Sequence, residues 1–297
     1  MRSLDPFDYF EPEDIREASE LLSAKGEKAC ILAGGIDLIP RLRKRMLEAD
    51  HVINIQKIPM MDSISFISGK GLTFGAMTRL RSLEKSSLVQ DEFLILYEAI
   101  HQIASTQVKF MGTAVGNLCV GTPASDLSTV MIALDAQLTI ANAEGQRNVP
   151  LSEFYLDYYR TDLEPGELVT HVFLPIPHNG TGTAFMNLVR TRADIAKVSV
   201  AVSLSVKNGV CSENRIAVGA AAPTVFRASK AETLLKGRKI NTEVIQEAAK
   251  AAAEQTQPIT DLRSTAGYRK EMTRVLVGRT LEMAHERARL QDEEAHP

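Results

Sequence analysis

The spacing of apolar residues alternates between helical and strand-like periods along the chain. Ile15, Ala18 and Leu22 share one face of a predicted helix, and Gly26 ends it. Beyond that helix the pattern predicts a strand in 29–35, a helix in 36–47, and strands in 51–58 and 71–80. The N-terminal part is therefore expected to mix helices with short strands.

The remainder of the chain divides at one boundary. Before it the pattern predicts a helix in 96–108, a glycine-broken loop segment in 110–126, a helix in 127–136 and a strand in 137–145. Dense prolines and glycines mark the boundary near 174–183. After it come predicted strands in 184–192, 197–206 and 215–221, helices in 226–237, 241–255 and 266–290, and a disordered tail in 291–297. We expect an α+β protein in two parts.

Composition narrows the functional classes. With 297 residues the chain can form two domains with cores of their own, and a net charge of −3 gives no electrostatic reason to bind nucleic acid. No window approaches the roughly 18 uninterrupted apolar residues of a membrane-spanning helix, and no basic lead with an apolar segment opens the chain. We therefore expect a cytoplasmic protein without a membrane span.

Cysteines and histidines give no sign of metal or nucleophile chemistry. Cys30, Cys119 and Cys211 lie about 90 residues apart, so they offer no CxxC pair and no set of four thiolates for an iron–sulfur cluster. The six histidines form no metal-ligand spacing, and no Ser/His/Asp or Cys/His arrangement stands out. The sequence predicts no metal site and no catalytic residue on this chain.

A first candidate binding loop, Ala33 to Asp37, lies where the predicted strand 29–35 ends. Gly34 and Gly35 let the backbone approach a ligand closely, and the N–H groups at the following helix start favour an anion such as a pyrophosphate. Asp37 is expected to cap that helix by accepting a backbone N–H. The alternative is an ordinary strand-to-helix turn. No GxGxxG or GxxxxGK[ST] motif is present, so neither a Rossmann fingerprint nor a P-loop is indicated.

A second candidate loop runs from Thr113 to Asp126 and ends at another buried helix. It combines glycines with hydroxyl groups, and Pro123 is expected in the first turn of the helix. Two such loops suit a dinucleotide better than one does, because pyrophosphate and ribose need separate donors. The alternative is that Ser125 and Asp126 only cap the helix.

The two loops together carry a family resemblance. Residues 32–40 (LAGGIDLIP), followed by residues 112–136 (GTAVGNLCVGTPASDLSTVMIALDA), resemble the FAD-binding medium subunit of the molybdenum hydroxylases, the family of xanthine dehydrogenase and carbon monoxide dehydrogenase. Stretches 184–204, 226–237 and 266–279 resemble that family's C-terminal part in the same order. The similarity spans nearly the whole chain.

The resemblance implies a fold and its domains. It implies a two-subdomain FAD-binding domain of the PCMH type in 1–176, split near 55–60. A smaller α+β domain in 177–290, made of a short antiparallel sheet plus helices, is implied to follow it.

The resemblance also implies non-covalent FAD and its binding residues. The pyrophosphate would be held by the first loop and by the start of the second. The ribose or adenine end would lie near Asp126, and Ile195 would lie near the isoalloxazine. The implied cofactor-binding residues are Leu32, Ala33, Gly34, Gly35, Ile36, Asp37, Leu38, Thr113, Ala114, Val115, Gly116, Asn117, Thr122, Ser125, Asp126 and Ile195.

Some positions depart from the family's usual residues. Ile36 stands where Thr or His is common, and Val115 stands where the family has a glycine. Lys109-Phe110 replaces an Arg-Asn pair, and Asn187 replaces a frequent lysine. These changes bear on cofactor affinity and potential more than on the fold.

The implied function is electron transfer within a complex. A large molybdenum-cofactor subunit would oxidise the substrate, a small subunit would carry [2Fe–2S] clusters, and this chain would pass the electrons through FAD to NAD or a quinone. Two alternatives stay open: a stand-alone flavin oxidoreductase of the same superfamily, and a flavin-free assembly protein.

Overall fold

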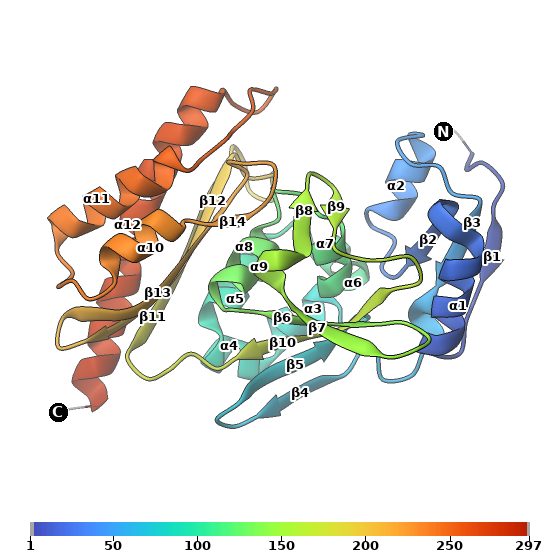
Figure 1. The fold of residues 1–297 in the computed structure, drawn as a ribbon, viewed down its shortest axis with the longest axis horizontal. Helices are drawn as coiled ribbons and strands as arrows, with labels where there is room; N and C mark the ends of the chain where they lie inside the picture. Colours follow the sequence, from blue (N-terminus) through green and yellow to red (C-terminus); the bar gives the residue numbers. More distant parts are fainter. Residues whose placement is uncertain (1–2, 296–297) are drawn as a thin grey trace.

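The computed structural model describes residues 3–295 and arranges them as three units in a row, each built around a sheet (Figure 1). The N-terminal unit lies at one end, the helix-rich central unit lies in the middle, and the C-terminal unit ends in a long helix at the other end. The fold is α+β, as the sequence predicted.

The N-terminal unit is a small parallel sheet of order β1-β3-β2 with two helices. Asp14 begins the first helix because its side chain accepts the N–H of Glu17, and Gly26 ends that helix at a φ of 67°. The elements are β1 (Asp8–Phe10), α1 (Ile15–Lys25), η1 (Gly26–Lys28), β2 (Ala29–Leu32), α2 (Leu38–Arg43), β3 (His51–Asn54) and η2 (Ile55–Lys57).

The central unit packs helices on an antiparallel sheet of order β4-β5-β10-β6-β7. A small hairpin, β8–β9, stands apart from that sheet. The elements are β4 (Ile64–Ile67), β5 (Gly71–Gly75), α3 (Leu80–Lys85), α4 (Ser87–Glu92), α5 (Leu94–Gln102), α6 (Thr106–Met111), α7 (Ala114–Cys119), α8 (Asp126–Ala133), β6 (Gln137–Ala141), β7 (Gln146–Pro150), α9 (Leu151–Phe154), β8 (Tyr155–Asp157), β9 (Arg160–Thr161) and β10 (Leu168–Pro175).

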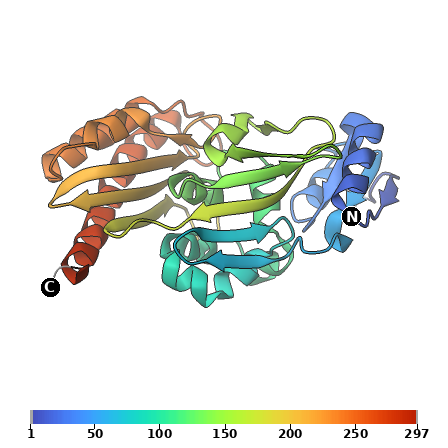
Figure 2. The ribbon, with the colours of Figure 1, turned by 60° about the horizontal axis from the view of Figure 1, so that its bottom comes forward.

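The C-terminal unit is an antiparallel sheet of order β11-β12-β13-β14, with three helices on one face (Figures 1 and 2). Its elements are β11 (Thr181–Leu188), β12 (Val198–Lys207), β13 (Val210–Gly219), β14 (Phe226–Arg227), α10 (Ser229–Leu235), α11 (Thr242–Glu254) and α12 (Ala266–Ala295). Helix α12 packs on β11 and β12, and it also contacts α11.

Helix α8 joins the central and C-terminal units. It contacts α5 on one side and strands β12 and β13 on the other, and all eight of its residues are buried. A helix enclosed in this way has no solvent face, which explains why the sequence 127–136 shows no charged face at helical spacing. Arg287 of α12 adds a second tie, with Nη2 2.6 Å from Glu98 Oε1 of α5.

Several sequence predictions differ from the structure. The segment 110–126 is not all loop, because residues 114–119 form helix α7. Helix α8 begins at Asp126 with Ser125 as its cap, so Pro123 precedes the helix and does not lie in its first turn. Helix α12 continues to Ala295, into the tail that was predicted to be disordered from residue 291; residues 296 and 297 lie outside the described part.

Candidate functional site

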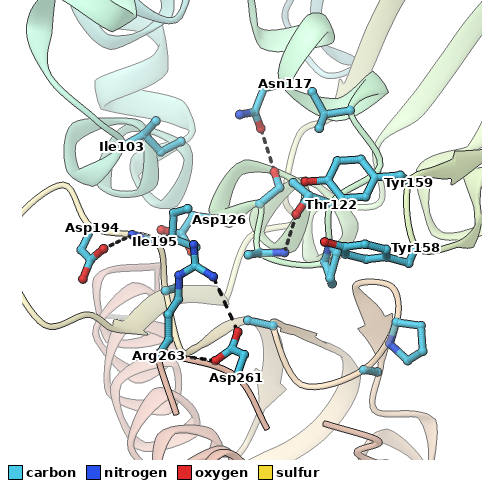
Figure 3. A pocket seen from close by; sticks show the side chains of 18 of the residues that line it. Ile103, Asn117, Thr122, Asp126, Tyr158, Tyr159, Asp194, Ile195, Asp261 and Arg263 are labelled. Atoms are coloured by element: carbon cyan, nitrogen blue, oxygen red, sulfur yellow. Dashed lines mark hydrogen bonds and ion pairs between the residues drawn. The ribbon is translucent and has the colours of Figure 1, made fainter. Parts of the chain in front are cut away.

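A cavity of about 730 Å³ lies where the central and C-terminal units meet (Figure 3), and Asp37, at the start of α2 in the N-terminal unit, also lines it. Its volume falls in the range of roughly 300–1,000 Å³ that is usual for small-molecule and cofactor sites. Six of the residues named from the sequence line it: Asp37, Asn117, Thr122, Ser125, Asp126 and Ile195. In Figure 3, Asn117 and Tyr159 lie on one side of this cavity, and Asp261 and Arg263 lie on the opposite side.

The other ten named residues do not line this cavity. They lie around the end of β2 and the start of α7, and they are Leu32, Ala33, Gly34, Gly35, Ile36, Leu38, Thr113, Ala114, Val115 and Gly116. The structure therefore separates the named residues into a cavity set and a set belonging to the two loop backbones.

The first loop presents a row of unpaired backbone donors. Within residues 3–295, the N–H groups of the four residues from Gly34 to Asp37 have no hydrogen-bond partner. Gly35 has a φ of 71°, the left-handed conformation that glycine adopts without steric cost. Successive free N–H groups before a helix form a concave anion-binding backbone, and this donor set matches the chemistry of a pyrophosphate.

Close packing between the N-terminal and central units requires a glycine at position 34. A Cβ at this position would overlap the carbonyl oxygen of Met111 and would lie 2.9 Å from the Cα of Gly112. Met111 ends helix α6 of the central unit and Gly112 follows it, so the first loop touches the backbone directly before the second loop. The two glycines thus have different roles. Gly34 permits close approach of the N-terminal and central units, and Gly35 permits the left-handed turn of the first loop.

Asp37 does not act as the helix cap that the sequence predicted. It occupies the N-cap position of α2, but its side chain accepts no backbone N–H there. Its carboxylate Oδ2 lies 3.3 Å from Arg41 Nη1 one turn later. The backbone of Asp37 is helical rather than extended, which turns its side chain away from the first-turn N–H groups.

In the second loop, Thr113 caps helix α7. Its Oγ1 accepts the N–H of Gly116 at 3.1 Å, and a Cβ on Gly116 would lie only 2.6 Å from that oxygen. The side chains of Ala114 and Val115 are buried in the main core. The valine at this unusual position therefore points its side chain into the protein interior and away from the cavity.

Ser125 and Asp126 have different roles at the start of α8. Ser125 Oγ accepts the N–H of Ser128 at 3.0 Å and caps the helix, as one of the alternatives held. Asp126 does not cap it: its Oδ2 accepts the amide of Asn187, on β11, at 2.8 Å. Its Oδ1 is buried without a hydrogen-bond partner among the described residues. Burial raises the pKa of this carboxyl to about 6, although the bond from Asn187 opposes the shift.

Sequence reasoning missed the two tyrosines at the tip of the β8–β9 hairpin. Tyr158 and Tyr159 line the cavity with their rings 4.4 Å apart in an edge-to-face arrangement. Tyr159 has a φ of 56°, and its N–H donates to the carbonyl of Gly121 at 3.0 Å. Only the paired aromatics in the short segment DYYR could have indicated this tip, because its contacts arise from tertiary packing.

It also missed the wall that the C-terminal unit supplies. Asp261 Oδ1 lies 2.7 Å from Arg269 Nη2, and Arg263 is held more loosely at 3.6 Å from Asp261. These residues lie between α11 and α12 or at the start of α12. Ile195 faces the same cavity from the segment before β12, where its N–H donates to Asp194 Oδ1 at 2.9 Å.

No cluster of three or more His, Cys, Asp or Glu side chains among residues 3–295 could hold a metal ion. Burial raises the pKa of the Cys119 thiol to about 12, so it is a poor nucleophile. None of the helices in the described part is both long enough and apolar enough to cross a membrane.

Comparisons with known proteins agree over most of the chain. Residues 5–177 match the family model of the FAD binding domain in molybdopterin dehydrogenase, and residues 183–284 match that of the CO dehydrogenase flavoprotein C-terminal domain. The carbon monoxide dehydrogenase medium chain of Hydrogenophaga pseudoflava is 34% identical over 94% of this chain and 96% of its own length. The xanthine dehydrogenase FAD-binding subunit of Escherichia coli O157:H7 is 27% identical over 93% and 95%.

Solved structures show the same fold. A chain of carbon monoxide dehydrogenase from Hydrogenophaga pseudoflava superposes with a TM-score of 0.93 at 35% identity, over 96% of this chain and 99% of that one. Quinoline 2-oxidoreductase from Pseudomonas putida 86 superposes with a TM-score of 0.89 at 28% identity, with the same coverage. The fold and the paired family domains define an oxidoreductase flavoprotein subunit. The chain belongs to the family of FAD-binding medium subunits of the molybdenum hydroxylases, as the resemblance of its two loops predicted.

Proposed function

We propose that this chain binds FAD non-covalently and transfers electrons within a molybdenum hydroxylase complex. The observation that supports this most directly is the row of unpaired N–H groups from Gly34 to Asp37, because it offers donors to a pyrophosphate without any basic side chain. The cavity beside it provides room for the rest of a cofactor.

The proposed binding residues follow from the two sets described above. The backbone of Leu32–Leu38 and the segment Thr113–Asn117 hold the pyrophosphate. Asp126 serves the ribose or adenine end, with Thr122 and Ser125 beside it in the cavity wall, and Ile195 packs near the isoalloxazine. FAD, when bound, supplies the electron chemistry; the protein supplies binding, orientation and electrostatics. We place the FAD-binding domain in 1–176, with its internal division near 55–60, and the C-terminal domain in 177–290.

In the proposed complex, the molybdenum cofactor and the [2Fe–2S] centres belong to a large and a small partner subunit. This chain receives electrons from the small subunit and passes them to NAD or a quinone. Membership of a family that includes carbon monoxide dehydrogenase medium chains supports this arrangement. The cytoplasmic location expected from the sequence stays a prediction.

The two alternatives have less support. The case for a flavin-free assembly protein rests on Val115 and Asn187, which depart from the family's usual residues. The Val115 side chain lies in the core, and the Asn187 amide donates to Asp126. Neither side chain therefore fills the cavity. A stand-alone flavin oxidoreductase would need acid–base residues of its own. Among the described residues that line the cavity, Asp126 is the one carboxyl with a raised pKa, of about 6, so the cavity wall offers little for such chemistry.

The first test is an absorption spectrum of the purified full chain, followed by release and chromatographic identification of any cofactor. Retained FAD at about one per chain, or stoichiometric uptake of added FAD, is the expected result. Co-purification with a large and a small subunit then separates the complex from a stand-alone enzyme. A colourless chain that does not take up FAD would overturn the electron-transfer role.

A further inference from the structure

Three hydroxyl groups connect the buried side of helix α8 to Asn117 in the cavity wall. The phenol oxygen of Tyr155 lies 2.8 Å from Ser128 Oγ. Ser128 Oγ lies 2.8 Å from Ser125 Oγ, and Ser125 Oγ lies 2.7 Å from Asn117 Oδ1. Ser125 and Ser128 are nearly fully buried, so solvent does not compete for these bonds.

Counting protons fixes the direction of this relay. Each hydroxyl has one proton to donate and two lone pairs. Ser125 Oγ already accepts the backbone N–H of Ser128 as the helix cap. If Ser125 donated to Ser128, and Ser128 to Tyr155, the phenol proton would have no acceptor among the described residues. The opposite direction satisfies every group: Tyr155 donates to Ser128, Ser128 donates to Ser125, and Ser125 donates to Asn117.

The direction of the relay orients the carboxamide of Asn117. Because Ser125 arrives as a donor, the amide must turn its oxygen toward Ser125. The NH₂ group is then left without a partner among residues 3–295, on a side chain that lines the cavity (Figure 3). Burial raises the pKa of Tyr155 above its ordinary value, so its phenol keeps its proton across the physiological range.

We propose that Tyr155 and Ser128 are positioning residues that hold Asn117 with its amide NH₂ presented to an oxygen acceptor of the bound ligand. The inference rests on the proposed function in so far as that ligand is FAD, whose phosphate, ribityl and carbonyl oxygens are acceptors of this kind. Neither residue lines the cavity, so each acts only through Asn117.

The test is a double-mutant cycle on the full-length chain with FAD affinity as the readout. Tyr155→Phe removes the proton that starts the relay and keeps the ring. We expect about a threefold larger dissociation constant for FAD, because Ser128 and Ser125 lose the donor that polarises and fixes their hydroxyls, so the amide of Asn117 is held less firmly with its NH₂ toward the ligand. Tyr97→Phe is the matched control: this ring stacks on His101, and its hydroxyl has no hydrogen bond to the described part of the chain.

The second arm repeats the change in an Asn117→Ala background. If Tyr155 acts through Asn117, Tyr155→Phe should then cost nothing further, so the two effects are non-additive. Equal losses in both backgrounds would overturn the proposal, as would an unchanged affinity in the single variant. Ser128→Ala should behave as Tyr155→Phe does, since it interrupts the relay at the next hydroxyl.

A readout without FAD separates this proposal from the proposed function. In the cofactor-free chain labelled with ¹⁵N-asparagine, the side-chain amide signal that disappears in Asn117→Ala identifies Asn117. Tyr155→Phe should shift this signal and speed its exchange with water, and Tyr97→Phe should leave it in place. An unmoved Asn117 signal would overturn the relay even if FAD binds, and a moved signal would support it even if FAD does not.

Discussion

The guanidinium carbon of Arg41 lies 4.8 Å from the centre of the Tyr159 ring. Arg41 belongs to helix α2, directly after the first loop, and the backbone of Tyr159 bonds to Gly121 in the second loop. The hairpin tip therefore links the two candidate FAD-binding loops across the boundary between the N-terminal and central units. A cation over an aromatic face at such an exposed site is worth about 0.5–1 kcal/mol.

Loss of the Tyr159 ring should loosen this link. We expect Tyr159→Ala to weaken FAD binding about two- to fivefold by removing the cation–π contact. Tyr159→Phe keeps a ring face for Arg41 and should stay near wild type. Fluorescence titration with FAD measures both variants. If Tyr159→Phe lost as much affinity as Tyr159→Ala, the hydroxyl rather than the ring would be responsible.

Gly34→Ala should destabilise the chain because the new methyl group meets the Met111 carbonyl. Overpacking of this kind lowers the free energy of unfolding by about 1–3 kcal/mol. It should also push the N-terminal and central units apart and so weaken FAD binding. Urea denaturation of the cofactor-free chain gives the stability. The matched control is Gly145→Ala, at an exposed turn where a Cβ meets nothing within 4 Å. A Gly34→Ala chain as stable as this control would contradict the packing role.

Asp126 should make the stability of the cofactor-free chain depend on pH. Its folded pKa of about 6 lies above its ordinary 3.8, so the folded chain holds this proton more tightly than the unfolded chain. Stability should therefore fall as pH rises from about 4 to above 6, by at most about 3 kcal/mol from this group.

Asp126→Asn removes the titration and keeps an oxygen that can accept the amide of Asn187. The variant should be more stable than wild type at pH 7.5, with the difference shrinking toward pH 5. Thermal melts at a series of pH values measure this. A difference that stays constant across that range would show that Asp126 does not titrate there.

A buried ion pair between α3 and α6 should be costly to break from one side. Lys109 Nζ lies 2.6 Å from Glu84 Oε1, and Arg81 contacts the other oxygen at 2.6 Å. Burial alone would raise the pKa of Glu84, but hydrogen bonds from Lys109 and Arg81 hold it below its usual value. This contribution to stability is thus present above pH 4.5 and is lost as the pH falls below that.

Lys109→Met should destabilise the chain by about 2–3 kcal/mol, somewhat less than the usual cost of breaking a buried pair because Arg81 remains. Removing both charges with Glu84→Gln and Lys109→Met should recover part of the loss. The exposed pair Lys57–Glu11, 2.7 Å apart, provides the control. Lys57→Met should leave the free energy of unfolding nearly unchanged, because solvent screens this exposed pair. Urea denaturation decides between these outcomes, and equal effects at both sites would refute the argument.

Local patterns predicted most of the secondary structure because they depend on neighbours in sequence. Gly26 ends α1 as its position suggested, and Ser125 caps α8 as one alternative held, although Asp126 does not. Helix α7 was missed because Gly116 looked like a loop residue, whereas the capping hydroxyl of Thr113 permits a helical turn there. Asp37 does not cap α2 as the sequence predicted, because its backbone is helical and its carboxylate pairs with Arg41.

The candidate site was predictable only in part. Asn117, Ser125 and Asp126 share one chain segment, so a motif can reveal them together. Tyr159 and Arg263 join them from positions 33 or more residues further along the chain, through contacts that no local pattern encodes. The partner of Asp126, Asn187, lies 61 residues away on a strand of the next unit.

The contact between Asp126 and Asn187 joins the central unit to the C-terminal unit, so it depends on both parts of the chain being present. Asp126 is covered by a strand that begins only after residue 180, so a chain cut in the 176–181 connection would leave the carboxyl open to water. Its acidity would then return to that of an ordinary aspartate. The strength of this one acid thus reports whether both halves are joined, and a gene that encoded them separately would have to restore their contact before the site could form.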